Sequence, residues 1–84
     1  MTQTHNLTPV EVAVHRLSRM SATEERMARL VQQGLRNRQI AEILHYSPRS
    51  VDVYLSRIYA KLGISSRLEL ARALDAAARP EVSS

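Results

Sequence analysis

Helix-start signals spaced along the chain are the feature that most constrains its fold. Three of them are capping boxes, in which Ser or Thr is followed three residues later by Glu: Thr8 with Glu11, Ser21 with Glu24, and Ser66 with Glu69. A fourth is Ser47, which precedes Pro48 at a first helical position. Such closely spaced starts leave room only for short helices joined by short connections.

Apolar residues at helical spacing extend these starts into five helices. The expected ranges are 9–19, 22–33, 37–44, 48–62 and 67–78, and Gly34 and Gly63 end the second and the fourth. No segment alternates apolar and polar residues as a half-buried strand would. The 84 residues suffice for one small core. The sequence therefore predicts an all-α fold.

The composition argues against several classes of protein. There is no cysteine, which rules out disulfides and cysteine-based zinc sites and is compatible with the cytoplasm. No apolar run approaches the roughly 20 residues of a membrane span, and no signal peptide is evident. His5, His15 and His45 share no metal-ligand spacing, and no nucleophile–base set or phosphate-binding loop is present. We expect a cytoplasmic protein without enzymatic activity, cofactor, metal or membrane contact.

Positive charge is concentrated in the middle of the chain. The net charge is +4, and residues 36–67 alone hold five Arg and one Lys against Glu42 and Asp52. A localised basic segment is typical of nucleic-acid binders. Many solvated helical proteins are equally basic, so charge alone is weak evidence.

The connection at 45–47 is only three residues long and joins a short helix to a longer one, which is the helix-turn-helix pattern. In the longer helix, Val51, Leu55, Ile58 and Leu62 form an apolar stripe. The opposite face is small and basic and suits the major groove of DNA. On this pattern alone, a generic helical bundle remains the alternative.

Two strings in the second half of the chain are similar to those of a known family. Residues 34–42 read G-L-R-N-R-Q-I-A-E, and residues 50–67 read S-V-D-V-Y-L-S-R-I-Y-A-K-L-G-I-S-S-R. Over residues 20 to about 75 the chain resembles the LuxR-type (GerE-type) helix-turn-helix domain, with its pattern G-L-S-N-K-E-I-A and then T-V-K-x-H-x-x-x-I-x-x-K-L-x-V-x-S-R. The family's opening L-T-x-x-E also occurs at Leu7, but thirteen residues too early, so we assign the first family helix to 22–33.

The resemblance implies a domain organisation. A four-helix DNA-binding domain would span 20–78, with 37–44 as scaffold and 48–62 as recognition helix. Residues 1–19 would be a tail and an additional helix, and 79–84 a C-terminal tail. The additional helix could extend a dimer seam, cover the core or dock a partner. The Met-Thr-Gln start and the polar tail favour a complete chain over a fragment of a longer regulator.

Family positions and helical geometry together assign the contact residues. Those expected to face bases are Arg49, Asp52, Val53, Ser56 and Arg57. Those expected to contact phosphates are Arg36, Arg38, Tyr54, Lys61 and Arg67. Val53 is apolar at an outward position and suits a thymine methyl group.

Three positions depart from the family pattern. Asp52 stands where Lys or Asn is frequent, and it could accept from a cytosine amino group or pair with a nearby Arg. Tyr54 replaces the usual His, and its hydroxyl could donate to a phosphate. His45 replaces a frequent Gly in the turn, where His tolerates a positive φ better than most residues.

The resemblance further suggests a symmetric homodimer on two half-sites, formed through the last helix. Its expected interface residues are Leu70, Leu74, Ala77 and Ala78. We therefore expect a sequence-specific regulator of transcription that binds double-stranded DNA. The competing hypothesis is a protein-interaction module that binds an RNA polymerase subunit, a sigma factor or another regulator. A third is the promoter-binding part of a sigma factor.

Overall fold

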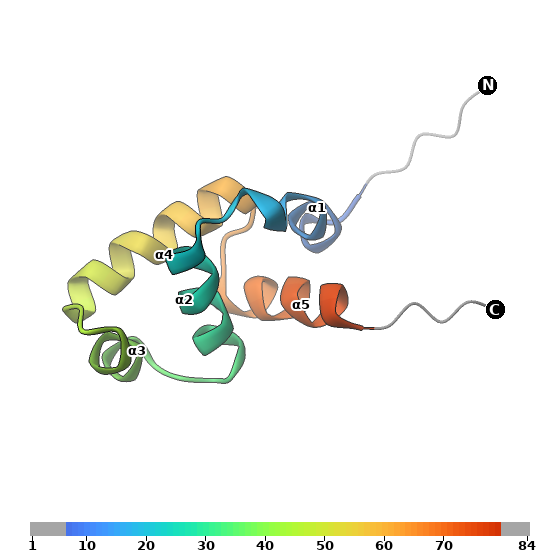
Figure 1. The fold of residues 1–84 in the computed structure, drawn as a ribbon. Coiled ribbons are helices and arrows are strands. Elements are labelled where there is room, and N and C mark those ends of the chain that lie inside the picture. Colours follow the sequence, from blue (N-terminus) through green and yellow to red (C-terminus); the bar gives the residue numbers. More distant parts are fainter. Residues whose placement is uncertain (1–6, 80–84) are drawn as a thin grey trace, which may run out of the picture.

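Five α-helices and one short 3₁₀ helix make up the part of the chain that the structure, a computed structural model, describes, residues 7–79 (Figure 1). They are α1 (Pro9–Arg16), η1 (Leu17–Arg19), α2 (Ala22–Gln32), α3 (Asn37–Leu44), α4 (Pro48–Leu62) and α5 (Arg67–Ala78). The all-α prediction is confirmed, and α3, α4 and α5 have the predicted bounds. The predicted helix at 9–19 changes to 3₁₀ geometry at Leu17. The tails predicted at 1–6 and beyond Arg79 lie outside the described residues.

Side-chain caps begin the helices where the sequence indicated. Ser21 Oγ accepts from the Glu24 N–H at 3.1 Å, and Glu24 Oε1 accepts from the Ser21 N–H at 2.9 Å. The same reciprocal pair forms at the start of α1. At α5 the box is altered, because Glu69 accepts from the N–H of Ser65 instead of Ser66. These bonds satisfy N–H groups that a helix start leaves without partners.

A left-handed residue makes the tight turn between α3 and α4. His45 has φ 62° and ψ 42°, as its place in the turn suggested. Its N–H and that of Tyr46 both donate to the Ala41 carbonyl. Ser47 then caps α4. The chain therefore changes direction sharply within three residues, and α3 packs across the start of α4 (Figure 1).

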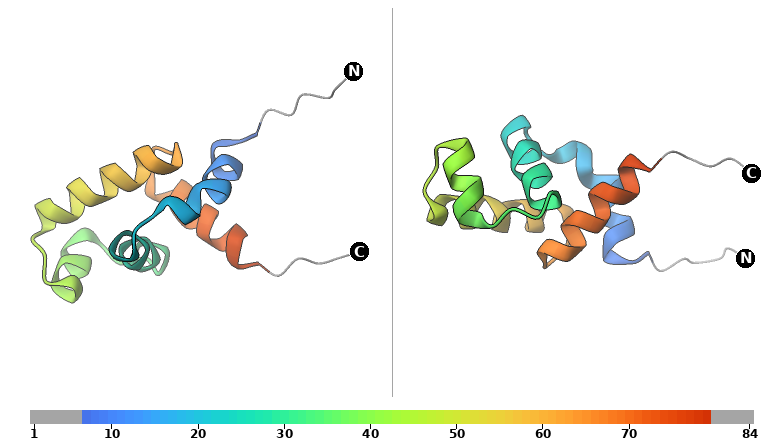
Figure 2. Two further views of the ribbon diagram at one scale, coloured as in Figure 1. Left: turned by 45° about the horizontal axis from the view of Figure 1, so that its top comes forward. Right: turned by 90° about the horizontal axis from the view of Figure 1, so that it is seen from below.

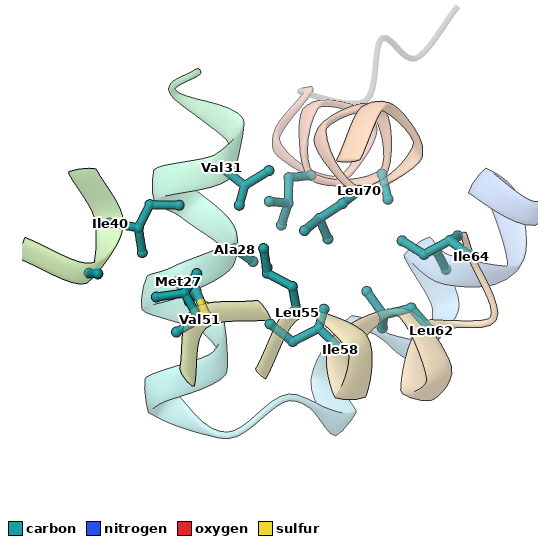
Figure 3. Packing of buried hydrophobic residues seen from close by; sticks show 14 residues of the cluster. Met27, Ala28, Val31, Ile40, Val51, Leu55, Ile58, Leu62, Ile64 and Leu70 are labelled. Atoms are coloured by element: carbon teal, nitrogen blue, oxygen red, sulfur yellow. The ribbon is translucent and has the colours of Figure 1, made fainter. Parts of the chain in front are cut away.

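One hydrophobic core joins all the α-helices. The predicted stripe of α4 is buried in it, facing Met27 of α2, Ile40 of α3 and Leu70 of α5 (Figure 3). Figures 1 and 2 show α4 running along one side of the molecule, with α3 near its start and α1 near its end. Burial of the stripe leaves the opposite face of α4 outside the core. No helix among the described residues is long and apolar enough to cross a membrane.

The additional helix α1 is part of this core. Ala13 is 0% exposed and belongs to the same buried cluster as Leu70 and Ala73 of α5. α1 also reaches the end of α4, because a Cβ atom at Gly63 (φ 76°) would lie 2.9 Å from Arg16 Nη1. Of the three roles left open for this helix, the structure shows that it covers the core.

This packing corrects the predicted dimer interface. Leu70 is 0% exposed and Leu74 is 4% exposed, so neither side chain is available to a second copy. α1 and α2 of the same chain pack on the face of α5 that the sequence assigned to a partner. Ala77 and Ala78 lie beyond the core, near the end of α5, and are exposed.

A buried carboxylate ties the start of α2 to the end of α4. Glu24 is 4% exposed, and its Oε1 accepts from Lys61 Nζ at 2.6 Å. Burial alone would raise the pKa of Glu24, but the bonds from Lys61 and from the Ser21 N–H outweigh burial. The pKa of Glu24 therefore lies below its ordinary value of 4.5.

Stability is expected to depend on this carboxylate in acid. The free energy of unfolding should decrease as the pH drops through and below about 4.5, because the unfolded chain then protonates Glu24 more readily than the folded chain does. The contribution is complete at neutral pH. Urea titrations between about pH 3 and pH 7 should show a shallower pH dependence for Glu24→Gln.

Glu25→Gln is the matched control for this measurement. Glu25 forms an exposed pair with Arg29 at 2.8 Å, and such pairs contribute about 0.5 kcal/mol or less. An unchanged pH dependence in Glu24→Gln would contradict the role assigned to the buried pair.

The place of α1 in the core gives a second prediction. Ala13→Asn puts an amide without a partner into the contact with α5 and should lower the free energy of unfolding by about 2 kcal/mol or more. His15→Asn, exposed on the same helix, should change it by less than about 0.5 kcal/mol. Equal effects in chemical denaturation would mean that α1 does not contribute to the core.

Candidate nucleic-acid interface

The outward face of α4 is a shallow hollow bounded by arginines. Arg49, Val53 and Arg57 follow each other at intervals of one helical turn, and Val53 is 46% exposed. Together with Ser50 and Tyr54 they line a hollow of about 350 Å³. Ser56 and Asp52 are also exposed on α4. The structure thus brings all five predicted base-facing residues to the exposed side of α4. For four of them it describes no side-chain hydrogen bond, whereas Asp52 accepts one.

A second basic surface lies at the start of α3. Arg36 is the residue that precedes the helix, and Arg38 lies in its first turn. Both side chains are exposed and line a hollow of about 460 Å³ together with Gln39. Gln39 Oε1 accepts from the Arg36 N–H at 2.8 Å and fixes the backbone there. Both guanidinium groups face solvent, as a phosphate contact requires.

The other two basic residues predicted to contact phosphates have partners within the chain. Lys61 binds Glu24, as described above. The Arg67 guanidinium donates to the Asn37 Oδ1 and to the Leu35 carbonyl, and the residue is half-buried. Their donors therefore hold helices together, because the fold brings acceptors to them that are distant in sequence. Phosphate contact at these two positions stays a prediction, beside the internal bonds that the structure shows.

Asp52 takes part in the same network. Asn37 donates its amide N–H to Asp52 Oδ1, while its Oδ1 accepts from Arg67. Hydrogen bonds thus connect α4 to the first residues of α3 and α5. Of the two roles considered for Asp52, direct pairing with Arg is not found among the described residues. Asn37 was missed as a site residue, although it stands at the Asn of the family string.

Tyr54 is held by another aromatic ring. Its ring stacks on Tyr46 with centroids 5.4 Å apart and planes 3° from parallel. The Arg57 guanidinium carbon lies 5.7 Å from the Tyr54 centroid. The neighbouring Tyr54 hydroxyl raises the pKa of Tyr46, while Thr23 and Arg26 of α2 act in the opposite direction. The sequence predicted a phosphate donor here and missed the stack.

No cluster of His, Asp or Glu side chains in residues 7–79 could hold a metal ion. The hollows described above are open and shallow. What the outward side chains offer is positive charge, hydrogen-bond donors and one apolar residue. This combination suits the major groove of DNA, where base edges present hydrogen-bond acceptors and thymine methyl groups between two phosphate backbones.

The internal role of Arg67 leads to a third prediction. Arg67→Ala removes two hydrogen bonds from a charged donor and should lower the free energy of unfolding by about 2 kcal/mol. Arg38→Ala, with an exposed guanidinium, should change it by less than about 0.5 kcal/mol. Urea denaturation of both variants at neutral pH tests this. Unchanged stability in Arg67→Ala would show that its guanidinium does not hold the helices together.

Comparison with known proteins adds independent findings. The model of a family described as bacterial regulatory proteins, luxR family, matches residues 18–74, so the match begins after α1. No solved structure matches the chain.

Curated relatives share this segment. An HTH-type transcriptional regulator of Mycobacterium bovis is 47% identical over 60 residues, which is 71% of this chain and 6% of that protein. A response regulator of Synechocystis is 47% identical over 49 residues, 58% of this chain and 21% of that protein. The tetrathionate response regulatory protein of Salmonella typhimurium is 36% identical over 62 residues, 74% and 30% of the two chains. The chain thus spans less than a third of the length of each of these relatives.

Proposed function

Because the chain belongs to the LuxR family of bacterial regulatory proteins, whose relatives carry names of transcriptional regulators, we propose that it binds specific DNA sequences through α4. In this proposal α4 is the recognition helix of a helix-turn-helix domain at 20–78. α1 lies outside that domain in sequence and covers its core. The protein would act in the cytoplasm, where bacterial DNA is found.

The observation that carries the proposal is the outward face of α4. Arg49 and Arg57 stand one turn to either side of Val53, around an open hollow. Arg binds guanine O6 and N7 through paired hydrogen bonds, and an apolar side chain favours the thymine methyl group. Ser56 adds a hydroxyl that can donate or accept. Asp52 keeps a second carboxylate oxygen for which the structure records no bond, and it remains a candidate acceptor for cytosine.

Backbone contacts would come chiefly from Arg36 and Arg38 at the start of α3. Lys61 and Arg67 have internal partners and are not part of this set. Neutralising phosphates releases counterions, so affinity should fall steeply with salt concentration. These contacts would place the domain on the duplex without reading its sequence.

We also propose that the protein works as a homodimer on two half-sites, with a revised seam. Leu68 is 59% exposed, and Arg72 and Ala76 follow it on the same outward face of α5. Ala77 and Ala78 are exposed near the end of that helix. Leu68, Arg72 and Ala76 lie on the part of α5 that faces away from the core, whereas Ala77 and Ala78 line a hollow beside η1 and α2.

The protein-interaction module stays the alternative function. It depended on the unexplained first helix and on the acidic Asp52. α1 has a place in the core, and Asp52 has a partner in Asn37. Neither feature therefore requires a protein partner to explain it.

Fluorescence anisotropy with duplexes selected from a random pool tests DNA binding. At fixed salt, Arg49→Ala and Arg57→Ala should each weaken binding to the selected duplex about tenfold or more and have less effect on scrambled duplexes. Arg29→Ala, a variant of an exposed Arg paired with Glu25 on α2, should bind as the parent chain does. Equal affinity of the parent chain for selected and scrambled duplexes would refute sequence-specific binding.

A further inference from the structure

Arg57 lies beside an aromatic ring, and no such contact is described for Arg49, the other outward-facing arginine of α4. Its guanidinium carbon is 5.7 Å from the centre of the Tyr54 ring, three residues earlier on the same helix. Residues at this spacing are neighbours on a helix surface. A guanidinium beside an aromatic face is attracted to it and loses freedom of movement before any ligand arrives.

The Tyr54 ring is itself fixed from outside α4. It stacks on Tyr46 with centroids 5.4 Å apart and planes 3° from parallel. Both tyrosines are half-buried and pack against the core. The stack therefore connects the start of α4 to the turn that precedes it.

Tyr46 has a well-defined backbone position in that turn. It follows the left-handed His45, and its N–H donates to the Ala41 carbonyl at 2.8 Å. The ring itself packs against the core. Its backbone attachment to α3 and its packing against the core make Tyr46 a firm support for Tyr54.

We propose that Tyr46 and Tyr54 are positioning residues that hold Arg57 ready to contact DNA. Tyr46 acts entirely through Tyr54, and Tyr54 acts through the guanidinium that it adjoins. The stack places that group at the edge of the hollow formed with Arg49 and Val53. Less freedom is then lost when Arg57 meets a base. This inference rests on the proposed DNA-binding function and adds a determinant outside α4.

A measurement without DNA tests the positioning itself. Nuclear magnetic resonance relaxation reports the order parameter of each Arg Nε–Hε group. In Tyr46→Leu the order parameter of Arg57 should fall clearly, while that of Arg49 on the same helix stays the same. Tyr46→Phe retains the ring and should leave both unchanged. An unchanged order parameter for Arg57 in Tyr46→Leu would overturn the inference, whatever the protein binds.

A double-mutant cycle on a selected duplex tests the consequence. Tyr46→Leu should weaken binding about three- to fivefold at fixed salt, and Tyr46→Phe should bind within about twofold of the parent chain. In an Arg57→Ala background, Tyr46→Leu should cause no further loss. Losses that multiply would show that Tyr46 acts independently of Arg57 and would overturn the inference.

A replacement variant and the parent chain's own specificity separate failure of the inference from failure of the proposed function. If Tyr46→Leu does not fold, as judged by circular dichroism, Tyr54→Leu replaces it in the relaxation experiment without DNA, with Tyr54→Phe as the control that retains the ring. If the parent chain does not distinguish selected from scrambled duplexes, the proposed function fails and the inference fails with it. If the parent chain distinguishes them but the cycle shows independent losses, only the inference fails.

Discussion

Burial of one stripe of α4 is the constraint on which the rest of the structure depends. Val51, Leu55, Ile58 and Leu62 are each at most 3% exposed, and a buried aliphatic side chain of this size contributes about 1.5–3 kcal/mol. Because α1, α2 and α3 pack against α4, and Leu70 of α5 joins the same core, the rotation of α4 about its axis is determined. The face with Arg49, Val53 and Arg57 then has to point outward. The surface proposed to read DNA is a consequence of the core.

Polar contacts complete this arrangement and limit which charges are free. The end of α4 is tied to α2 by Lys61 and Glu24, and Arg67 and Asn37 join the starts of α5 and α3. A basic side chain whose donors are bonded within the chain is costly to redirect toward a phosphate. The basic segment at 36–67 therefore divides into cations that are bonded to acceptors of the same chain, Lys61 and Arg67, and cations for which the structure describes no such bond. The net charge of the segment does not show which of its cations belong to which group.

Much of the fold could be predicted because its signals are local. Capping boxes, a three-residue turn with His45 in the left-handed conformation, and the glycine that ends α4 each depend on a few neighbouring residues. The roles of Leu70, Leu74, Asp52 and Lys61 could not be predicted in the same way. Their partners come from helices distant in sequence. In the sequence, the apolar stripe of α5 has the same pattern whether α1 of the same chain or a second copy of the protein covers it.

Sequence signals alone identified where each helix begins, where α3, α4 and α5 end, which stripe of α4 is apolar, and the family to which the chain belongs. These properties follow from helical periodicity and short-range hydrogen bonds. The packing of α1 against α5, the bond from Asn37 to Asp52 and the stack of Tyr46 on Tyr54 became visible only in the folded chain. These contacts depend on how helices are placed in space. Their placement is set by packing of the whole core, which no local segment encodes.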